Sequence, residues 1–207
     1  MMKKIVSICL MVAVLSIPAS AVVIGDWEDG MDGWADWSSS ATYTPGATEG
    51  VTLGSGSLLV EQSGWGQSLS IKLQNSGLVD EFMANSIFSI DMSVAANDGT
   101  ITGGYTQIYA VSMNAAGPGW TDVASGTPVN FYWWPGSGAR TQTLEIDYSA
   151  FRDAITSTGY VEIIFSLNTG GGAPPQMYFD NAQLLVPEPA TLSLLGLGAA
   201  ALLRRKK

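Results

Sequence analysis

The sequence predicts an all-β protein: a two-sheet antiparallel β-sandwich of the jelly-roll type, with an N-terminal signal helix and a C-terminal hydrophobic helix. Runs of alternating apolar and polar residues recur through the middle of the chain, which is typical of strands buried on one face. Turn signals containing glycine and proline separate these runs. No unit of roughly twenty to fifty residues repeats, which argues against a propeller or a solenoid.

The first 21 residues have the composition of a secretory signal peptide. Lys3 and Lys4 precede an apolar stretch at residues 5–17, and Ala19-Ser20-Ala21 fits a cleavage site flanked by small residues. We therefore expect export and an exported chain that begins at Val22.

Residues 22–186 are expected to form one sandwich domain of about eight to ten strands. The expected strands, with apolar residues at every second position, cover 57–61, 69–73, 88–94, 105–113, 131–134, 144–148, 161–167 and 177–185. Turn signals fall at 97–99, 117–119, 135–138 and 170–175. Apolar residues four positions apart predict two short helical turns, at 78–83 and 151–155.

The domain is strongly acidic. Residues 22–186 contain seventeen acidic and three basic side chains, a formal net charge of −14. This charge disfavours nucleic acid and anionic lipid as partners, whereas neutral glycans and divalent cations are compatible with it. The chain has no histidine, and its one cysteine, Cys9, lies in the signal peptide. The exported domain therefore has no disulfide and must be stabilised by its core.

Aromatic residues provide the first candidate site. In the segment 131–134, alternation places Phe131 and Trp133 on one face and the other two rings on the opposite face. Exposed Tyr and Trp rings offer flat apolar surfaces with a polar edge, on which sugar rings can stack. The alternative is that most of these rings pack in the core or against loops. The candidate ligand-binding residues are Tyr132, Trp134, Trp120 and Trp65, the last two in glycine-rich segments expected to be loops.

Three segments resemble jelly-roll carbohydrate-binding modules of the galactose-binding-like type. Trp27-Glu28-Asp29-Gly30 with the following Gly33-Trp34 is similar to their opening strand and loop, residues 54–60 to their next strand, and residues 178–184 to their closing strand. The resemblance implies the architecture, and the fold itself hosts many roles.

The same resemblance implies a structural calcium ion where the first and last strands meet. Calcium requires six to eight oxygen ligands, roughly 2.3–2.6 Å away. We expect Glu28 and Asp180 as ligands, with Glu49 as a third. The alternative is that these acids are solvated and that Asp180 and Asn181 form local turn hydrogen bonds.

The sequence argues against an enzyme. Glu145-Ile146-Asp147 resembles the Glu-x-Asp core of retaining jelly-roll glucanases, which need a further acid shortly afterwards. The residues that follow, Tyr148 to Phe151, include no acid. The lack of histidine also excludes a Ser-His-Asp or Cys-His nucleophile.

The tail, residues 187–207, has three parts in a fixed order: Pro187-Glu188-Pro189, an uncharged apolar run at 190–203, and Arg204-Arg205-Lys206-Lys207. The run of 14 residues is shorter than the roughly 20 that a spanning helix usually needs. This order resembles the PEP-CTERM sorting signal of Gram-negative bacteria. The resemblance implies transient anchoring in the inner membrane, cleavage by an exosortase and release to the cell surface or exopolysaccharide matrix. The alternative is an anchor that is never processed.

These observations predict an exported, non-catalytic protein that binds an extracellular polysaccharide. The alternatives are a purely structural matrix protein and a small glycan-active hydrolase or lyase.

Overall fold

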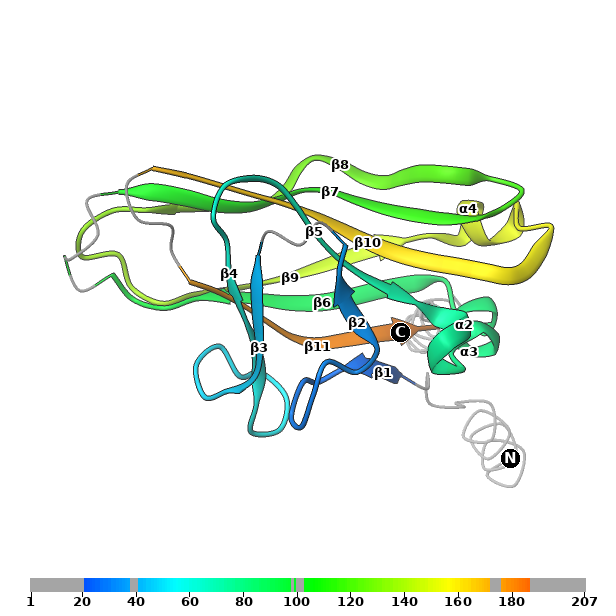
Figure 1. Cartoon of the computed structure of the whole chain (residues 1–207), viewed down its shortest axis with the longest axis horizontal. Helices are drawn as coiled ribbons and strands as arrows, with labels where there is room; N and C mark the ends of the chain where they lie inside the picture. The colour runs from blue at the N-terminus through cyan, green and yellow to red at the C-terminus, as the bar shows by residue number, and fades with distance from the viewer. Residues whose placement is uncertain (1–20, 38–40, 98, 100–102, 172–175, 187–207) are drawn as a thin grey trace, which may run out of the picture.

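The structure is a computed structural model, which describes residues 21–37, 41–97, 99, 103–171 and 176–186. In these ranges the chain forms eleven strands in two antiparallel sheets, with three short helices. Figure 1 shows the long strands β7, β8 and β10 running side by side, with β6, β9 and β11 below them. The predicted all-β sandwich is confirmed. The predicted signal and C-terminal helices, with Pro187, Glu188, Pro189, Arg204 and Arg205, lie outside the described residues.

Sheet A has the strand order β3-β4-β11-β6-β9, and β1 also pairs with β11. Its strands are β1 (Val22–Gly25), β3 (Thr42–Ala47), β4 (Ser57–Glu61), β6 (Ile87–Val94), β9 (Arg140–Asp147) and β11 (Met177–Leu185). The β1–β11 pairing places Val22 opposite Leu184. The two ends of the domain therefore lie side by side.

Sheet B has the strand order β2-β5-β10-β7-β8. Its strands are β2 (Trp34–Asp36), β5 (Trp65–Lys72), β7 (Gly104–Ala116), β8 (Gly119–Trp133) and β10 (Ser157–Gly171). β10 is central, pairing with β5 on one side and β7 on the other. β2 and β8 form the two edges.

The sequence did not predict β2, β3 or most of β8. β3 contains Pro45 and β8 contains Gly126 and Pro128, which weaken the strand pattern. Both are edge strands, where proline is tolerated because one side of the strand needs no hydrogen-bond donor. Sequence periodicity alone therefore misses edge strands of this sandwich.

The helices are short and gather at one end of the molecule (Figure 1). They are α2 (Leu73–Ser76), α3 (Val79–Ala84) and α4 (Ser149–Asp153). The expected turns at 78–83 and 151–155 correspond to α3 and α4. Tyr148, expected in a strand, instead precedes α4, where its hydroxyl donates to the Phe82 carbonyl at 3.0 Å. Within the described ranges, no helix has the length and apolar character needed to cross a membrane.

Phe165 of β10 lies at the centre of the core between the sheets. Its ring centroid is 5.4 Å from that of Trp34, 5.7 Å from that of Phe88 and 5.6 Å from that of Phe179. Phe88 and Phe179 belong to sheet A, whereas Phe165 and Trp34 belong to sheet B. These aromatic contacts therefore join the two sheets directly.

Replacing Phe165 with alanine is expected to lower the free energy of unfolding by about 3–5 kcal/mol, since the change leaves a cavity among three rings. Urea unfolding followed by tryptophan fluorescence measures the loss. Trp134→Ala serves as the control, because Trp134 is exposed and should cost about 0.5 kcal/mol or less. Equal losses for the two variants would contradict the central role of Phe165.

Candidate functional site

The outer face of sheet B carries six aromatic side chains that form three ring pairs, and we call it the aromatic face. Strand alternation turns Phe165, Ile163 and Leu167 of β10 into the core, so the residues between them point outward. Cross-strand pairing then places residues of the neighbouring strands on the same outer side. The aromatic residues of this face are Trp37, Trp65, Tyr105, Tyr109, Trp120 and Tyr132.

Two bulges place Trp65 and Tyr109 on this face. The register shifts between Ile108 and Ala110 in β7, leaving Tyr109 as the extra residue. It also shifts where β5 passes Gly66, whose φ of 78° suits glycine. Bulges redirect side chains. Here they bring Trp65 and Tyr109 together across β10, with stacked rings 5.1 Å apart and 8° between their planes.

Tyr105 and Tyr132 form a second aromatic pair near one end of the face. They are direct cross-strand partners in β7 and β8, with ring centroids 6.4 Å apart. An added Cβ at Gly170 would lie 2.7 Å from the Tyr105 ring. Glycine is therefore needed at position 170 to let this ring lie flat against β10.

Trp37 and Trp120 form a third pair that joins opposite edges of the sheet. Trp37 follows β2, and its backbone N–H donates to the backbone carbonyl of Ser68 in β5. Trp120 belongs to β8. Flat edge strands separated by four strand spacings would lie about 19 Å apart. The ring centroids are nevertheless only 5.5 Å apart. The two side chains therefore reach toward each other over the strands between them.

The floor of the aromatic face is polar and partly acidic. Glu162 accepts hydrogen bonds from the Ser70 hydroxyl at 3.0 Å and from the Tyr160 hydroxyl. The Ser112 hydroxyl donates to Asp122 at 2.6 Å. Burial, together with the hydrogen bond to Glu162 and its negative charge, raises the pKa of Tyr160 to about 12. Tyr160 therefore stays a neutral hydrogen-bond donor at physiological pH.

The four aromatic residues nominated from the sequence are all exposed: Trp65 by 71%, Trp134 by 63%, Tyr132 by 55% and Trp120 by 48%. Phe131 and Trp133 are buried, as alternation predicts. The expectation that Trp65 and Trp120 stand in loops is wrong, because both lie in strands. Trp37, Tyr105 and Tyr109 were missed, since their positions depend on the bulges and on the strand order.

The acidic residues Asp180 and Glu28 both hold the loop at residues 52–55. Asp180 is fully buried and accepts hydrogen bonds from the backbone N–H groups of Thr52 and Leu53, at 2.5 and 2.7 Å. Glu28 accepts from the Ser55 N–H and from the Ser55 hydroxyl at 2.6 Å. These hydrogen bonds from Ser55 lower the pKa of Glu28.

Asp91 completes this network and was missed by the sequence analysis. It lies opposite Asp180 in the register of β6 and β11. Its carboxylate accepts from the hydroxyls of Thr52 at 2.8 Å and Thr143 at 2.5 Å, and from the Asn181 amide at 3.1 Å. The two buried carboxylates thus accept hydrogen bonds from the loop, from β9 and from Asn181.

Glu28 and Asp180, expected as calcium ligands with Glu49, already accept hydrogen bonds from N–H and O–H groups of the loop. Glu49 is exposed and accepts from the Thr48 hydroxyl. Nowhere in the described part of the chain do three or more acidic, thiol or imidazole side chains converge to hold a metal. Calcium binding stays a prediction to be tested.

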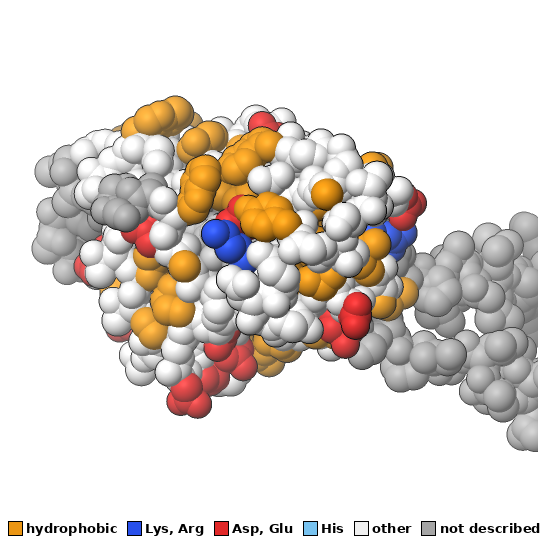
Figure 2. Space-filling view, turned by 45° about the vertical axis from the view of Figure 1, so that its right-hand side comes forward, with side chains coloured by type: hydrophobic (Ala, Val, Ile, Leu, Met, Phe, Trp, Pro, Cys, Tyr) orange, Lys and Arg blue, Asp and Glu red, His pale blue; other side chains and the backbone are white. Residues whose placement is uncertain are grey.

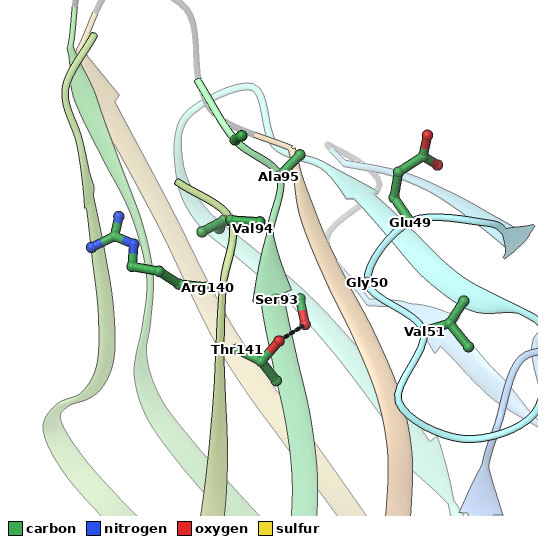
Figure 3. A pocket seen from close by; sticks show the side chains of 10 residues that line it. Glu49, Gly50, Val51, Ser93, Val94, Ala95, Arg140 and Thr141 are labelled. Atoms are coloured by element: carbon green, nitrogen blue, oxygen red, sulfur yellow. Dashed lines mark hydrogen bonds between the residues drawn. The ribbon is translucent and has the colours of Figure 1, made fainter. Parts of the chain in front are cut away.

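A hollow of about 430 Å³ opens on the outer side of sheet A (Figure 3). The hydroxyls of Ser93 and Thr141 are hydrogen-bonded at 2.8 Å on its floor. Figure 3 shows Glu49 on the loop across from them and the Arg140 side chain pointing away. The Arg140 guanidinium donates instead to the Tyr132 carbonyl. This hollow therefore presents hydroxyls but no facing pair of acids.

Glu145 and Asp147, considered as catalytic acids, are exposed on β9. The Ser149 hydroxyl and N–H lower the pKa of Asp147, with the N–H bond at 2.8 Å. Asp147 is therefore held as a carboxylate, not as a proton donor.

Comparison with known proteins identifies the tail and the fold. Residues 185–207 match the PEP-CTERM protein-sorting motif, so the chain carries this motif. The motif implies export by way of an exosortase to the cell surface. No curated protein matches the chain in sequence.

The β-sandwich is similar in fold to solved carbohydrate-binding modules. The CBM27-1 module of Caldicellulosiruptor saccharolyticus, solved with mannohexaose, matches with a TM-score of 0.50 and 15% identity, over 83% of this chain and 99% of that one. The CBM22-1 xylan-binding domain of Paenibacillus barcinonensis Xyn10C matches with a TM-score of 0.48 and 14% identity, over 83% and 99%. The mannan-recognising module TmCBM27 gives 0.47 and 16%, over 82% and 97%.

Asp180→Asn is expected to destabilise the domain by about 1–3 kcal/mol, because an amide cannot accept as many of the loop's buried N–H groups. Chemical unfolding measures the loss, and limited proteolysis should show faster cleavage near residues 52–55. Asp153→Asn is the control, because Asp153 is exposed and pairs only with the neighbouring Arg152. A stable Asp180→Asn variant would contradict the role of this carboxylate.

Calcium bound at Glu28 and Asp180, as the sequence predicts, would raise the thermal melting midpoint, because a ligand of the folded state stabilises that state. Melting curves recorded in millimolar calcium and in excess chelator test this expectation. A higher midpoint in calcium, abolished by Glu28→Gln, would show that a metal site forms there.

Proposed function

We propose that this chain is an exported, non-catalytic glycan-binding protein of the cell surface or exopolysaccharide matrix of a Gram-negative bacterium. An exosortase would recognise Pro187-Glu188-Pro189, after the apolar run and Arg204-Arg205 had held the chain transiently in the inner membrane. The sorting motif supports the route, and the fold supports a binding role.

The observation that carries the proposal is the grouping of three aromatic pairs on one outer face of sheet B. Exposed Tyr and Trp rings that do not pack in a core are unusual, and flat rings favour stacking with the C–H faces of sugars. We assign stacking with the ligand to Trp65 and Tyr132, with Tyr105 and Tyr109 beside them. Trp120 and Trp37 border this site, and Trp134 follows Tyr132 just after β8.

Polar groups of the same face can orient a sugar by hydrogen bonding. Gln107 and Asn130 are cross-strand partners on the outer side. Both residues are half-buried, so their side-chain amides can donate to and accept from a sugar hydroxyl.

The charge of the domain favours a neutral glycan. Glu162 and Asp122 lie on the aromatic face, and acids outnumber bases throughout the exported chain. In Figure 2, acidic side chains are spread over the visible surface, few basic ones appear, and hydrophobic side chains form several patches. A uronic-acid polymer would be repelled by this field.

Trp65→Ala is expected to weaken glycan binding about tenfold, which corresponds to about 1.4 kcal/mol, because it removes one stacking ring. Affinity electrophoresis of the full chain in mild detergent, through gels containing neutral polysaccharides, measures the change. Leu53→Ala is the matched control, since Leu53 is an exposed apolar residue of the loop on sheet A.

The alternatives give different outcomes in the same experiment. A purely structural matrix protein would show no retardation on any glycan. A hydrolase or lyase would shorten the polysaccharide, which reducing-end assays detect.

A further inference from the structure

One part of the aromatic face is covered. Ile164 of β10 points outward and lies outside the hydrophobic core between the sheets, yet its exposure is 0%. Its neighbours on the outer side, Ser112 in β7 and Ser70 in β5, are exposed by only 1% and 4%. An outward residue is buried only if other side chains lie over it. Trp37 and Trp120, which reach toward each other from the two edge strands, are in position to do so.

The other part of the face is open. Two aromatic pairs lie at the end of the face away from Ile164. They are Trp65 with Tyr109, and Tyr105 with Tyr132. Trp65 and Tyr132 are each more than half exposed. Gln107 and Asn130, cross-strand partners between these pairs, are half-buried, unlike the covered Ile164. The rings and amides of this part are therefore accessible to a sugar.

We propose that the Trp37–Trp120 pair closes one end of the aromatic face, so that the open part binds the terminus of a neutral glycan chain and not an internal stretch. This inference rests on the proposed glycan binding. A chain lying along the face would have to pass through the space above Ile164 that the two indoles cover. A chain that ends before this barrier meets no such obstacle.

The barrier itself is tested without a ligand. Ser112→Cys places a thiol under the indole pair, and Cys9→Ser makes it the only thiol of the full chain. The thiol should react slowly with iodoacetamide in this variant and at least tenfold faster when Trp37→Ala and Trp120→Ala are added. Equal rates, with circular dichroism showing both variants folded, would overturn the proposed cover.

The choice between chain end and chain interior is tested with short and long preparations of mannan, xylan and cellulose-derived chains. An end binder should saturate at the same number of protein molecules per glycan chain, whatever the chain length. In the Trp37→Ala/Trp120→Ala variant, this number should rise with length. Leu53→Ala should behave as the unchanged chain does.

Each result has a distinct meaning. Binding by the unchanged chain in proportion to glycan length contradicts chain-end selection and leaves glycan binding intact. No binding to any of these preparations contradicts both the inference and the proposed function for neutral β-linked glycans.

Discussion

The contact of Phe165 with Trp34, Phe88 and Phe179 is the interaction on which the rest of the structure depends. The exported domain has no cysteine, so no disulfide links its two sheets. The apolar layer between the sheets must supply the cohesion. Because β10 contributes Phe165 from the centre of sheet B, every other strand of that sheet is positioned relative to this ring. The aromatic face is thus the outer side of the same sheet whose inner side forms half of the core.

The two faces of β10 carry different kinds of side chain. Ile163, Phe165 and Leu167 point inward and fill the core, whereas Glu162 and Asn168 point outward among polar and aromatic neighbours. In sheet A, the outward acids Asp91 and Asp180 serve a different purpose, since they fasten the loop at residues 52–55. The two outer faces therefore differ: one is occupied by its own loop and the other is available to a partner.

Alternation in the sequence was sufficient to predict the sandwich, the buried Phe131 and the exposed Tyr132, because burial at every second residue is a local property. It could not predict Tyr109 or Trp37 on the aromatic face. Tyr109 faces outward because of a bulge, and Trp37 meets a ring from the opposite edge strand. Likewise, the acids near the termini were recognised as a group, but the donors that satisfy Asp180 come from a loop more than a hundred residues away in sequence. Long-range pairing is not encoded in a local pattern.

The pairing of β1 with β11 has a mechanical consequence. The tail continues from β11, which hydrogen-bonds to β4, β6 and β1 and so lies inside sheet A, not at its margin. Any pull transmitted through the tail therefore loads several rows of backbone hydrogen bonds at once, in shear along the strand. The aromatic rings lie on sheet B, whose strands hydrogen-bond among themselves, so such a load does not pass directly through them.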